Sequence, residues 1–255
     1  MPGRRLRAGL AASLIAAALF TAGAAADPAL VETGNLVLRA DGGFQPRTLP
    51  QRQFAPTVFR GWASVRTKDG SVPPPLRQVI VDFDRDGRLD VAGLPTCDPA
   101  RVAAAGPRQA RRLCAAARVG TGRIRASVGL GELVAPANIP LSLFNGPARN
   151  GGPTLIVHAR VPFPFARSYA IVAPIERRRG AFRYRVVLDL PSVDAGLGAI
   201  SYIGVDVGRR FSAGGKQRSY TSARCAGGVL RTHGRFSFAD GTVIDGAVEK
   251  ACTQR

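Results

Sequence analysis

Four aspartates at short, regular intervals give the sequence its most specific chemical signal. They are Asp82, Asp84, Asp86 and Asp90, and together with Gly87 they form the pattern D-x-D-x-D-G-x-x-D. Calcium takes about six to eight oxygen ligands, and carboxylates at alternate positions can wrap one ion where a glycine allows a sharp turn. The spacing therefore indicates a loop that could hold a structural calcium ion.

The same residues are also typical of a two-strand hairpin that holds no ion. Its turn would be Arg85-Asp86-Gly87, and Arg85 and Arg88 would neutralise the carboxylates by forming ion pairs. Both interpretations stay open on the sequence alone. In either case the aspartates have a structural role, and no catalytic residue is predicted in this loop.

A resemblance to a known repeat supports the first interpretation. Residues 81–91 resemble the calcium loop of FG-GAP and related propeller repeats, and this implies that the four aspartates are ligands of a structural ion. The loop departs from an EF-hand, because Gly93 occupies the position where an EF-hand supplies a bidentate glutamate. The pattern occurs once, whereas a propeller needs many copies. Apart from this calcium ion, the sequence indicates no cofactor.

Four cysteines form the second group of reactive side chains: Cys97, Cys114, Cys225 and Cys252. In an exported chain they are expected to be oxidised to disulfides, and three connectivities are possible. Nearest-neighbour pairing fits the local elements best, with Cys97 bonded to Cys114 and Cys225 bonded to Cys252. No pair has Cys-x-x-Cys spacing, so a zinc site is not indicated.

The residues that usually carry enzymatic catalysis form no recognisable constellation. His158 and His233 are the only histidines, and the chain has no Gly-x-Ser-x-Gly elbow and no His-Glu-x-x-His motif. Asp189 with Asp194 or Glu132 could be imagined as a glycosidase pair, but nothing in the sequence sets the separation that this chemistry requires. No catalytic residue is therefore predicted.

The elements that position these residues have the period of β-strands. In 182–190, Phe182, Tyr184 and Leu188 alternate with Arg183 and Asp189, as expected of a strand with one buried face. Short turns at 176–180 and 239–241 each indicate a hairpin. Other strands are expected at 35–39, 57–67, 78–83, 122–128, 140–145, 154–161, 169–176, 200–207, 234–238 and 242–250.

One region departs from the strand pattern. Asp98 can cap a helix, and 109–117 is rich in helix formers and ends near Gly120. The predicted fold is therefore mainly β, an antiparallel β-sandwich or jelly-roll-like arrangement with one short helix and two disulfides. We expect one domain over 27–255, and the glycine- and proline-rich stretch at 146–153 is a possible subdomain break.

The first 26 residues have the pattern of a signal peptide. Three arginines precede an apolar run at 8–23, and Ala24-Ala25-Ala26 is a small-residue cleavage site. The apolar run is shorter than the roughly 20 residues that a membrane span needs. We therefore expect a secreted, extracytoplasmic mature protein, exported by either the Sec or the twin-arginine route.

The chain is strongly basic, with a formal charge of +19, and all but three of its 36 cationic side chains are arginines. Such a charge attracts polyanions, of which an anionic cell-wall polymer or a membrane surface are the expected partners. No motif indicates specific binding of nucleic acid. The abundance of arginine, alanine, glycine and proline also follows from a GC-rich genome.

Several stretches resemble one group of proteins. They are 73–77, 87–97, 114–122, 143–146 and 235–241, together with the signal peptide. In combination they resemble uncharacterised exported proteins of high-GC Gram-positive bacteria over nearly the whole mature chain. The resemblance implies no activity, and it supplies no functional residues.

These features predict an exported, non-enzymatic β-domain that acts as a binding or structural module at the cell envelope. The alternative is an extracellular hydrolase that acts on glycans or esters. A pocket with two close carboxylates, or a serine near His158, would favour the hydrolase. A flat, arginine-rich sheet face with no pocket would favour the binding module.

Overall fold

The computed structural model describes residues 28–130, 133–162, 166–191 and 198–255. The predicted signal peptide at 1–26 lies outside these ranges, as do Glu132 and Asp194. In the part of the chain that is described, no helix is long and apolar enough to cross a membrane.

A 12-stranded antiparallel sheet forms the body of the protein. In spatial order its strands are β1 (Ala29–Thr33), β2 (Leu36–Gln45), β5 (Val58–Thr67), β13 (Ala199–Val207), β8 (Arg118–Leu130), β9 (Leu133–Arg149), β10 (Gly152–Val161), β11 (Arg167–Arg177), β12 (Phe182–Asp189), β6 (Leu76–Asp84), β17 (Val229–Phe238) and β18 (Val243–Ala251). The prediction of a mainly β, antiparallel fold is confirmed.

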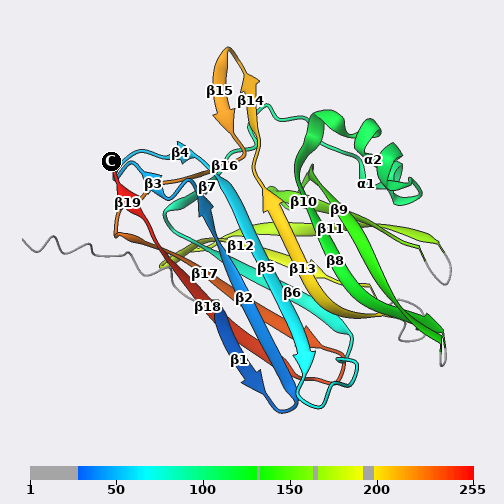
Figure 1. Ribbon diagram of the computed structural model, residues 1–255. Coiled ribbons are helices and arrows are strands. Elements are labelled where there is room, and N and C mark those ends of the chain that lie inside the picture. Colours follow the sequence, from blue (N-terminus) through cyan, green and yellow to red (C-terminus); the bar gives the residue numbers. More distant parts are fainter. Residues whose placement is uncertain (1–27, 131–132, 163–165, 192–197) are drawn as a thin grey trace, which may run out of the picture.

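The sheet folds over on itself to give two layers. Figure 1 shows β2, β5, β13 and β8 in one layer, with β12, β6, β17 and β18 behind them. Strand β18 also packs against β1 and β2, so the two ends of the sheet approach each other. The fold is sandwich-like as predicted, but its two layers belong to one continuous sheet rather than to two separate sheets.

Alternation of side chains explains why the interior of this sandwich is apolar. In β12, Tyr184 and Leu188 are buried while Asp189 is exposed. In β8, Ile124 is buried between the exposed Arg123 and Arg125. Because one face of each strand is turned inward, the layers bury a single large hydrophobic cluster between them.

Short strands gather at one end of the sandwich. They are the parallel pair β3 (Thr48–Leu49) and β19 (Thr253–Gln254), the group β4 (Ala55–Pro56), β16 (Thr221–Ala223) and β7 (Gly87–Leu89), and the hairpin of β14 (Arg210–Ala213) and β15 (Lys216–Ser219). The β14–β15 hairpin projects beyond the main sheet, at the top of Figure 1. Of these strands, β4, β16 and β7 and the β14–β15 hairpin line the cleft described below.

The helical region is divided where the sequence predicts one helix. Helix α1 (Pro99–Ala103) is followed by α2 (Pro107–Leu113) and by the 3-10 turn η1 (Ala115–Ala117). Asp98 caps α1 as predicted, since its Oδ1 accepts a hydrogen bond of 2.9 Å from the N–H of Ala100. Gly106 and Pro107 separate the helices, because proline cannot donate the backbone hydrogen bond that would continue α1.

Both predicted disulfides are present, Cys97–Cys114 and Cys225–Cys252. The first joins the segment before α1 to the end of α2, where buried residues of both helices pack on Phe144 and Ile156 of the sheet. The second lies in a separate small cluster at the end that carries the short strands. Each bond therefore fixes a region outside the main core.

The glycine- and proline-rich stretch at 146–153 contains the end of β9, a turn at 150–151 and the start of β10, and the two strands pair directly. Asn150 and Gly151 have positive φ angles of 49° and 73°, so the chain reverses in a tight two-residue turn. His233, which precedes the strand expected at 234–238, lies within β17 opposite Ala247, so this strand begins earlier than predicted.

Candidate functional site

The predicted aspartate loop joins β6 to β7, and its first three carboxylates are buried. Asp82 accepts two hydrogen bonds from Arg185, both of 2.8 Å, and Asp86 accepts one of 2.7 Å from Arg224. Asp82 and Asp86 are only 3% and 4% exposed, so these partners replace water around the two carboxylates. Each of the two charges is thus neutralised by its own arginine.

The other two aspartates bond mainly to the backbone around them. Asp84 accepts hydrogen bonds from the N–H groups of Asp86 and Arg231, at 2.8 Å and 2.9 Å. Asp90 accepts one bond of 3.0 Å from the N–H of Ala92 and one of 2.9 Å from Arg218. The four carboxylates therefore tie strands from distant parts of the sequence together.

Electrostatics at Asp82 favour the ionised carboxylate. Burial works in the opposite direction, but the hydrogen bonds and the charge of Arg185, with a smaller effect of His233, hold the pKa of Asp82 below its ordinary value. The pKa of Arg185 is raised in turn by its bonds to Asp82. The pair is therefore charged at neutral pH.

The arginines that neutralise this loop were not the ones predicted. The sequence points to Arg85 and Arg88, whereas the observed ion pairs use Arg185, Arg218 and Arg224. Among the residues described, no group of three or more His, Cys, Asp or Glu side chains is arranged to hold a metal ion. Calcium binding by this loop thus stays a prediction, and the geometry of the four aspartates gives it no support.

Phe54 is the centre of an arginine cluster that the sequence did not reveal. The guanidinium carbons of Arg88, Arg183 and Arg224 lie 5.8 Å, 5.3 Å and 5.1 Å from the centre of its ring. Those distances are within the range of cation–π attraction. The three arginines come from three different strand regions, so no local spacing in the sequence could have predicted the cluster.

Next to this cluster lies a polar cleft of about 590 Å³. It is lined by Phe54, Pro56, Arg88, Asp90, Arg210, Lys216, Gln217, Arg218, Ser219 and Ser222. Four of these side chains are cationic, and the single carboxylate, Asp90, is already paired with Arg218. Within the described chain, neither Arg210 nor Lys216 has an acidic partner, and the β14–β15 hairpin holds both side chains exposed.

His158 has a structural environment. It is 1% exposed, and its Nε2 donates a 3.0 Å hydrogen bond to the carbonyl of Ala105 after α1. Ser168 donates to the same carbonyl at 2.8 Å. Burial lowers the pKa of His158. The serine and the histidine therefore share one acceptor instead of forming a nucleophile and its base.

The other groups considered for hydrolysis do not come together either. Asp189 is exposed at the end of β12, where it accepts a 2.6 Å hydrogen bond from Gln78. Its imagined partners, Asp194 and Glu132, lie outside the described residues. His233 lies 3.7 Å from a carboxylate oxygen of Asp82 and 3.7 Å from one of Asp245. It thus lies between the buried carboxylate of Asp82 and the exposed carboxylate of Asp245.

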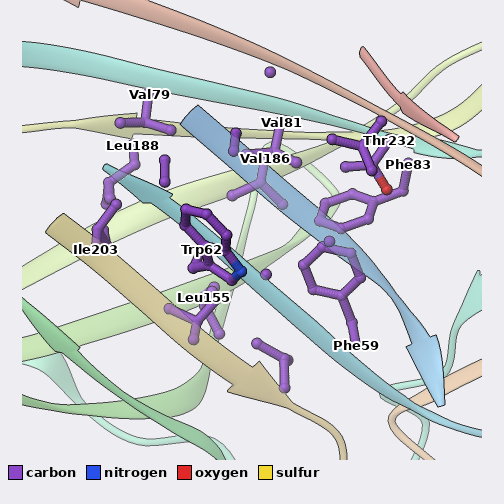
Figure 2. Close-up of a pocket in the computed structure, with 18 of the residues that line it drawn as sticks. Phe59, Trp62, Val79, Val81, Phe83, Leu155, Val186, Leu188, Ile203 and Thr232 are labelled. Atoms are coloured by element: carbon purple, nitrogen blue, oxygen red, sulfur yellow. The ribbon is translucent and has the colours of Figure 1, made fainter. Parts of the chain in front are cut away.

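A second space lies inside the sandwich, where the layers do not fill the interior. Its volume is about 220 Å³, and it is lined almost wholly by apolar side chains from both layers. Figure 2 shows Val81, Val186 and Leu188 on one wall, with Phe59 and Ile203 on the other. Strand alternation in 182–190 predicts that Leu188 points inward, but it could not predict that the two layers leave a cavity.

The chain was also compared with family models, with curated proteins and with solved structures, and no match was found in any of the three. The functional argument therefore depends on the residues and geometry of this chain alone.

Proposed function

We propose that this protein is a non-enzymatic, extracytoplasmic binding module that holds an anionic cell-wall polymer in the cleft between the β14–β15 hairpin and the short strands β4, β7 and β16. The observation that carries the proposal is the charge of this cleft. Arg88, Arg210, Lys216 and Arg218 line it, against a single carboxylate that is already paired.

The shape of the cleft increases the effect of its charges. Cations on opposite walls of a concave surface add their fields where water is partly displaced, so an anion is attracted more strongly there than on a flat face. Arg210 and Lys216 stand on the projecting hairpin and Arg88 lies on β7 across the cleft. A chain with repeated phosphate or carboxylate groups could contact both walls at once.

Phe54 contributes order to this surface. Its ring attracts Arg88, Arg183 and Arg224 and so adds a further restraint to three long side chains, of which Arg183 and Arg224 are also held by hydrogen bonds to the Arg85 carbonyl and to Asp86. A guanidinium that is already positioned loses less conformational entropy when it binds a phosphate or a carboxylate. The cluster therefore favours binding of anions by arginines that are held in place beforehand.

The covalent structure fits an envelope location. The two disulfides indicate an oxidising, extracytoplasmic environment. The signal-peptide pattern at 1–26 and the charge of +19 support export to a site rich in anionic polymers. Localisation at the cell envelope is part of the proposal.

Retention of the mature protein on purified Gram-positive cell wall, measured across a salt series, tests the proposal. Strong binding at low salt should weaken steadily as salt screens the charges. Replacing Arg210 and Lys216 with glutamate should lower retention by about tenfold or more. The matched control replaces Arg101 and Arg108 of the helices, which are also exposed, with glutamate and should retain most of the binding.

Defined polymers identify the anion. Polyphosphate and poly-glutamate present phosphate and carboxylate groups on otherwise simple chains, and competition by one of them alone would assign the preferred group. Absence of retention at low salt would reject the proposal. Equal losses in the cleft and helix variants would also reject it, because binding would then follow net charge alone.

A further inference from the structure

The outer face of the layer made of β2, β5, β13 and β8 carries exposed arginines beside two aromatic rings. It is turned toward the viewer in Figure 1, and no described helix or strand lies over it. Directly opposite residues of an antiparallel sheet point to the same side, and two such rows cross this face. One row is Arg39, Ser64, Tyr202 and Arg125, and the other is Asp41, Trp62, Gly204 and Arg123.

The neighbours of these residues show that the rows lie on the outside of the sandwich. Arg123 and Arg125 are exposed on either side of the buried Ile124. Trp62 borders the interior cavity, but its ring stacks on Tyr202, which does not line that cavity. The two ring centres are 6.3 Å apart and the ring planes differ by 17°. Both rings are therefore half-buried on the outer face, next to exposed cations.

Tyr202 holds the two arginines of β8 in place. The guanidinium carbons of Arg125 and Arg123 lie 4.5 Å and 5.3 Å from the centre of its ring, within the range of cation–π attraction. Gly204 leaves room for this ring, because a Cβ there would lie 2.5 Å from the Tyr202 hydroxyl oxygen. A planar guanidinium that stacks on a ring can still donate its N–H groups. The two arginines can therefore bind an anion without leaving Tyr202.

The positive charge of this face is not balanced by its acids. Both acids on the outer side of these strands are already engaged, Asp41 with Lys250 at 2.7 Å and Asp206 with Arg60 at 3.7 Å. Three exposed cations, by contrast, form no ion pair with an acid of the described chain: Arg39, Arg123 and Arg125. The surface is thus complementary in charge to an anionic partner.

The combination of rings and arginines favours a lipid surface as that partner. Tryptophan and tyrosine are enriched where a bilayer meets water, because each has an apolar ring and a polar tip. Arginine can lay its apolar stem along lipid while its guanidinium pairs with phosphate. Tyr202, Arg123 and Arg125 line neither the cleft nor the interior cavity, and the rows extend over four strands. A broad, flat partner can therefore contact all of them at once.

We propose that this aromatic–arginine face docks on an anionic lipid surface, with Trp62 and Tyr202 among the headgroups and Arg39, Arg123 and Arg125 bound to lipid phosphates. None of these five residues lines the cleft. The inference therefore adds a second partner on a separate surface and goes beyond the binding of cell-wall polymer.

Lipid vesicles test the proposal directly, since Trp62 is the only tryptophan of the chain and its emission reports on this face alone. The mature protein is mixed with vesicles of phosphatidylcholine alone or with about 30% phosphatidylglycerol added. The anionic vesicles should shift the emission to shorter wavelength, and brominated phosphatidylglycerol should quench it. Neutral vesicles should cause neither change. Co-sedimentation gives the partition constant.

Variants with the same change in net charge test the location. Arg123→Glu combined with Arg125→Glu should lower the partition constant by about thirtyfold or more, because two attractive charges become repulsive. The control combines Arg101→Glu with Arg108→Glu on the helices and should lower it by about threefold or less. Circular dichroism and intact disulfides confirm folding. If the double variant of the face fails to fold, Arg125→Gln alone replaces it, with an expected loss of about fivefold.

A variant that keeps every charge tests the role of the ring. Tyr202→Ser removes the surface on which the two arginines stack and should lower the partition constant by about three- to tenfold. An unchanged partition constant in this variant would show that the arginines bind lipid without being held in place.

The cleft variant separates this inference from polymer binding. Arg210→Glu combined with Lys216→Glu should bind anionic vesicles as well as the helix control does, while the face variant should keep its retention on purified cell wall. Four results would overturn the proposal. They are absence of vesicle binding at low salt, equal losses in the face and helix variants, vesicle binding without quenching of Trp62, and a shift of its emission by polyphosphate alone, which would assign the face to polymer.

Discussion

Arg185 donates Nε and Nη2 to the two carboxylate oxygens of Asp82, each at 2.8 Å, between residues that lie directly opposite each other on β12 and β6. Asp82 is 3% exposed, so this bidentate pair is the partner that compensates its loss of water. The two strands are far apart in the sequence and are neighbours in the back layer. The pairing of these two strands thus depends on a buried carboxylate that keeps its charge only while Arg185 is bonded to it.

Removing the arginine should destabilise the protein. We expect Arg185→Met to lower the free energy of unfolding by about 2–4 kcal/mol, because Asp82 would remain buried without a counter-charge. The control is Arg60→Met, which breaks an exposed 3.7 Å pair with Asp206 and should change stability by about 0.5 kcal/mol or less. Urea unfolding of both variants gives the comparison. Equal losses of unfolding free energy in the two variants would mean that burial of Asp82 does not increase the contribution of its ion pair to stability.

The individual strands of this fold could be predicted from the sequence, but the pairing of strands that are distant in the sequence could not. Alternation of Tyr184, Val186 and Leu188 predicts the strand and its inward face, because that period depends only on neighbouring residues. The position of β6 between β12 and β17 depends on pairing over a long sequence separation. No spacing within a segment could reveal it, and for the same reason Arg185 could not be assigned to Asp82.

The same distinction between local and long-range features decides which parts of the candidate sites could be predicted from the sequence. The two disulfides were predicted because each joins nearby cysteines with a short element between them. The cleft could not be predicted, since Phe54, Arg88 and Arg218 come from distant parts of the sequence and meet only in the folded chain. Pro136 and Pro140 also hid the length of β9, because proline argues against a strand interior although both residues lie within its pairing with β8.

The buried histidine should make stability depend on pH. Burial lowers the pKa of His158, so the folded state takes up a proton less readily than the unfolded chain. Stability from this group is therefore complete above the ordinary histidine pKa of about 6.5 and declines as pH falls toward the folded-state value, by at most about 1.4 kcal/mol per pH unit. Urea unfolding at pH 7 and pH 5 measures the decline.

Two variants separate this effect from other titrations. His158→Gln should flatten the dependence between pH 7 and pH 5, since glutamine can still donate to Ala105 but does not titrate there. His233→Gln should leave the decline in place, because it keeps the buried His158 and its bond to Ala105. An unchanged slope in His158→Gln would show that another group causes the acid sensitivity.

Asp82 should produce a second, more acidic transition. Its pKa is lowered in the folded state, so its contribution is present above the ordinary carboxyl value of about 3.9 and is lost as pH falls below it. We expect Arg185→Met to remove most of the stability loss in this range. Unfolding midpoints between pH 5 and pH 2 should therefore converge for variant and wild type as the solution becomes more acidic.

The cysteine pairs should contribute comparably to stability. The bonds join residues separated by 17 and 27 positions, and the chain-entropy model gives each about 3 kcal/mol. Replacing Cys97 and Cys114 with alanine should loosen the helices first, because their packing on Phe144 and Ile156 lies outside the main core. Amide hydrogen exchange should accelerate in 98–118 before the sheet is affected. Simultaneous exchange of both regions would contradict this order.

Calcium addition discriminates between the two interpretations of the aspartate loop. Because Arg185, Arg218 and Arg224 already engage three of its carboxylates, we expect the melting midpoint to be the same in calcium and in chelator. A midpoint that rises with calcium and falls again with chelator would instead support the calcium loop. Asp84→Asn serves as the reference, because it should abolish any such shift if the loop binds an ion.

The hydroxyl of Tyr220 is buried without a hydrogen-bond partner among the described residues, and this gives a prediction about stability. A buried polar atom without a partner is destabilising, and replacing it with an apolar group of the same shape is neutral or favourable. Tyr220→Phe should therefore unfold at an equal or higher urea concentration than wild type, with a gain of up to about 1 kcal/mol in the free energy of unfolding. Tyr184→Phe is the control, since Tyr184 also lines the cavity but its hydroxyl is not among the buried atoms without a partner. A clear loss of stability in Tyr220→Phe would mean that the hydroxyl has a hydrogen-bond partner in solution.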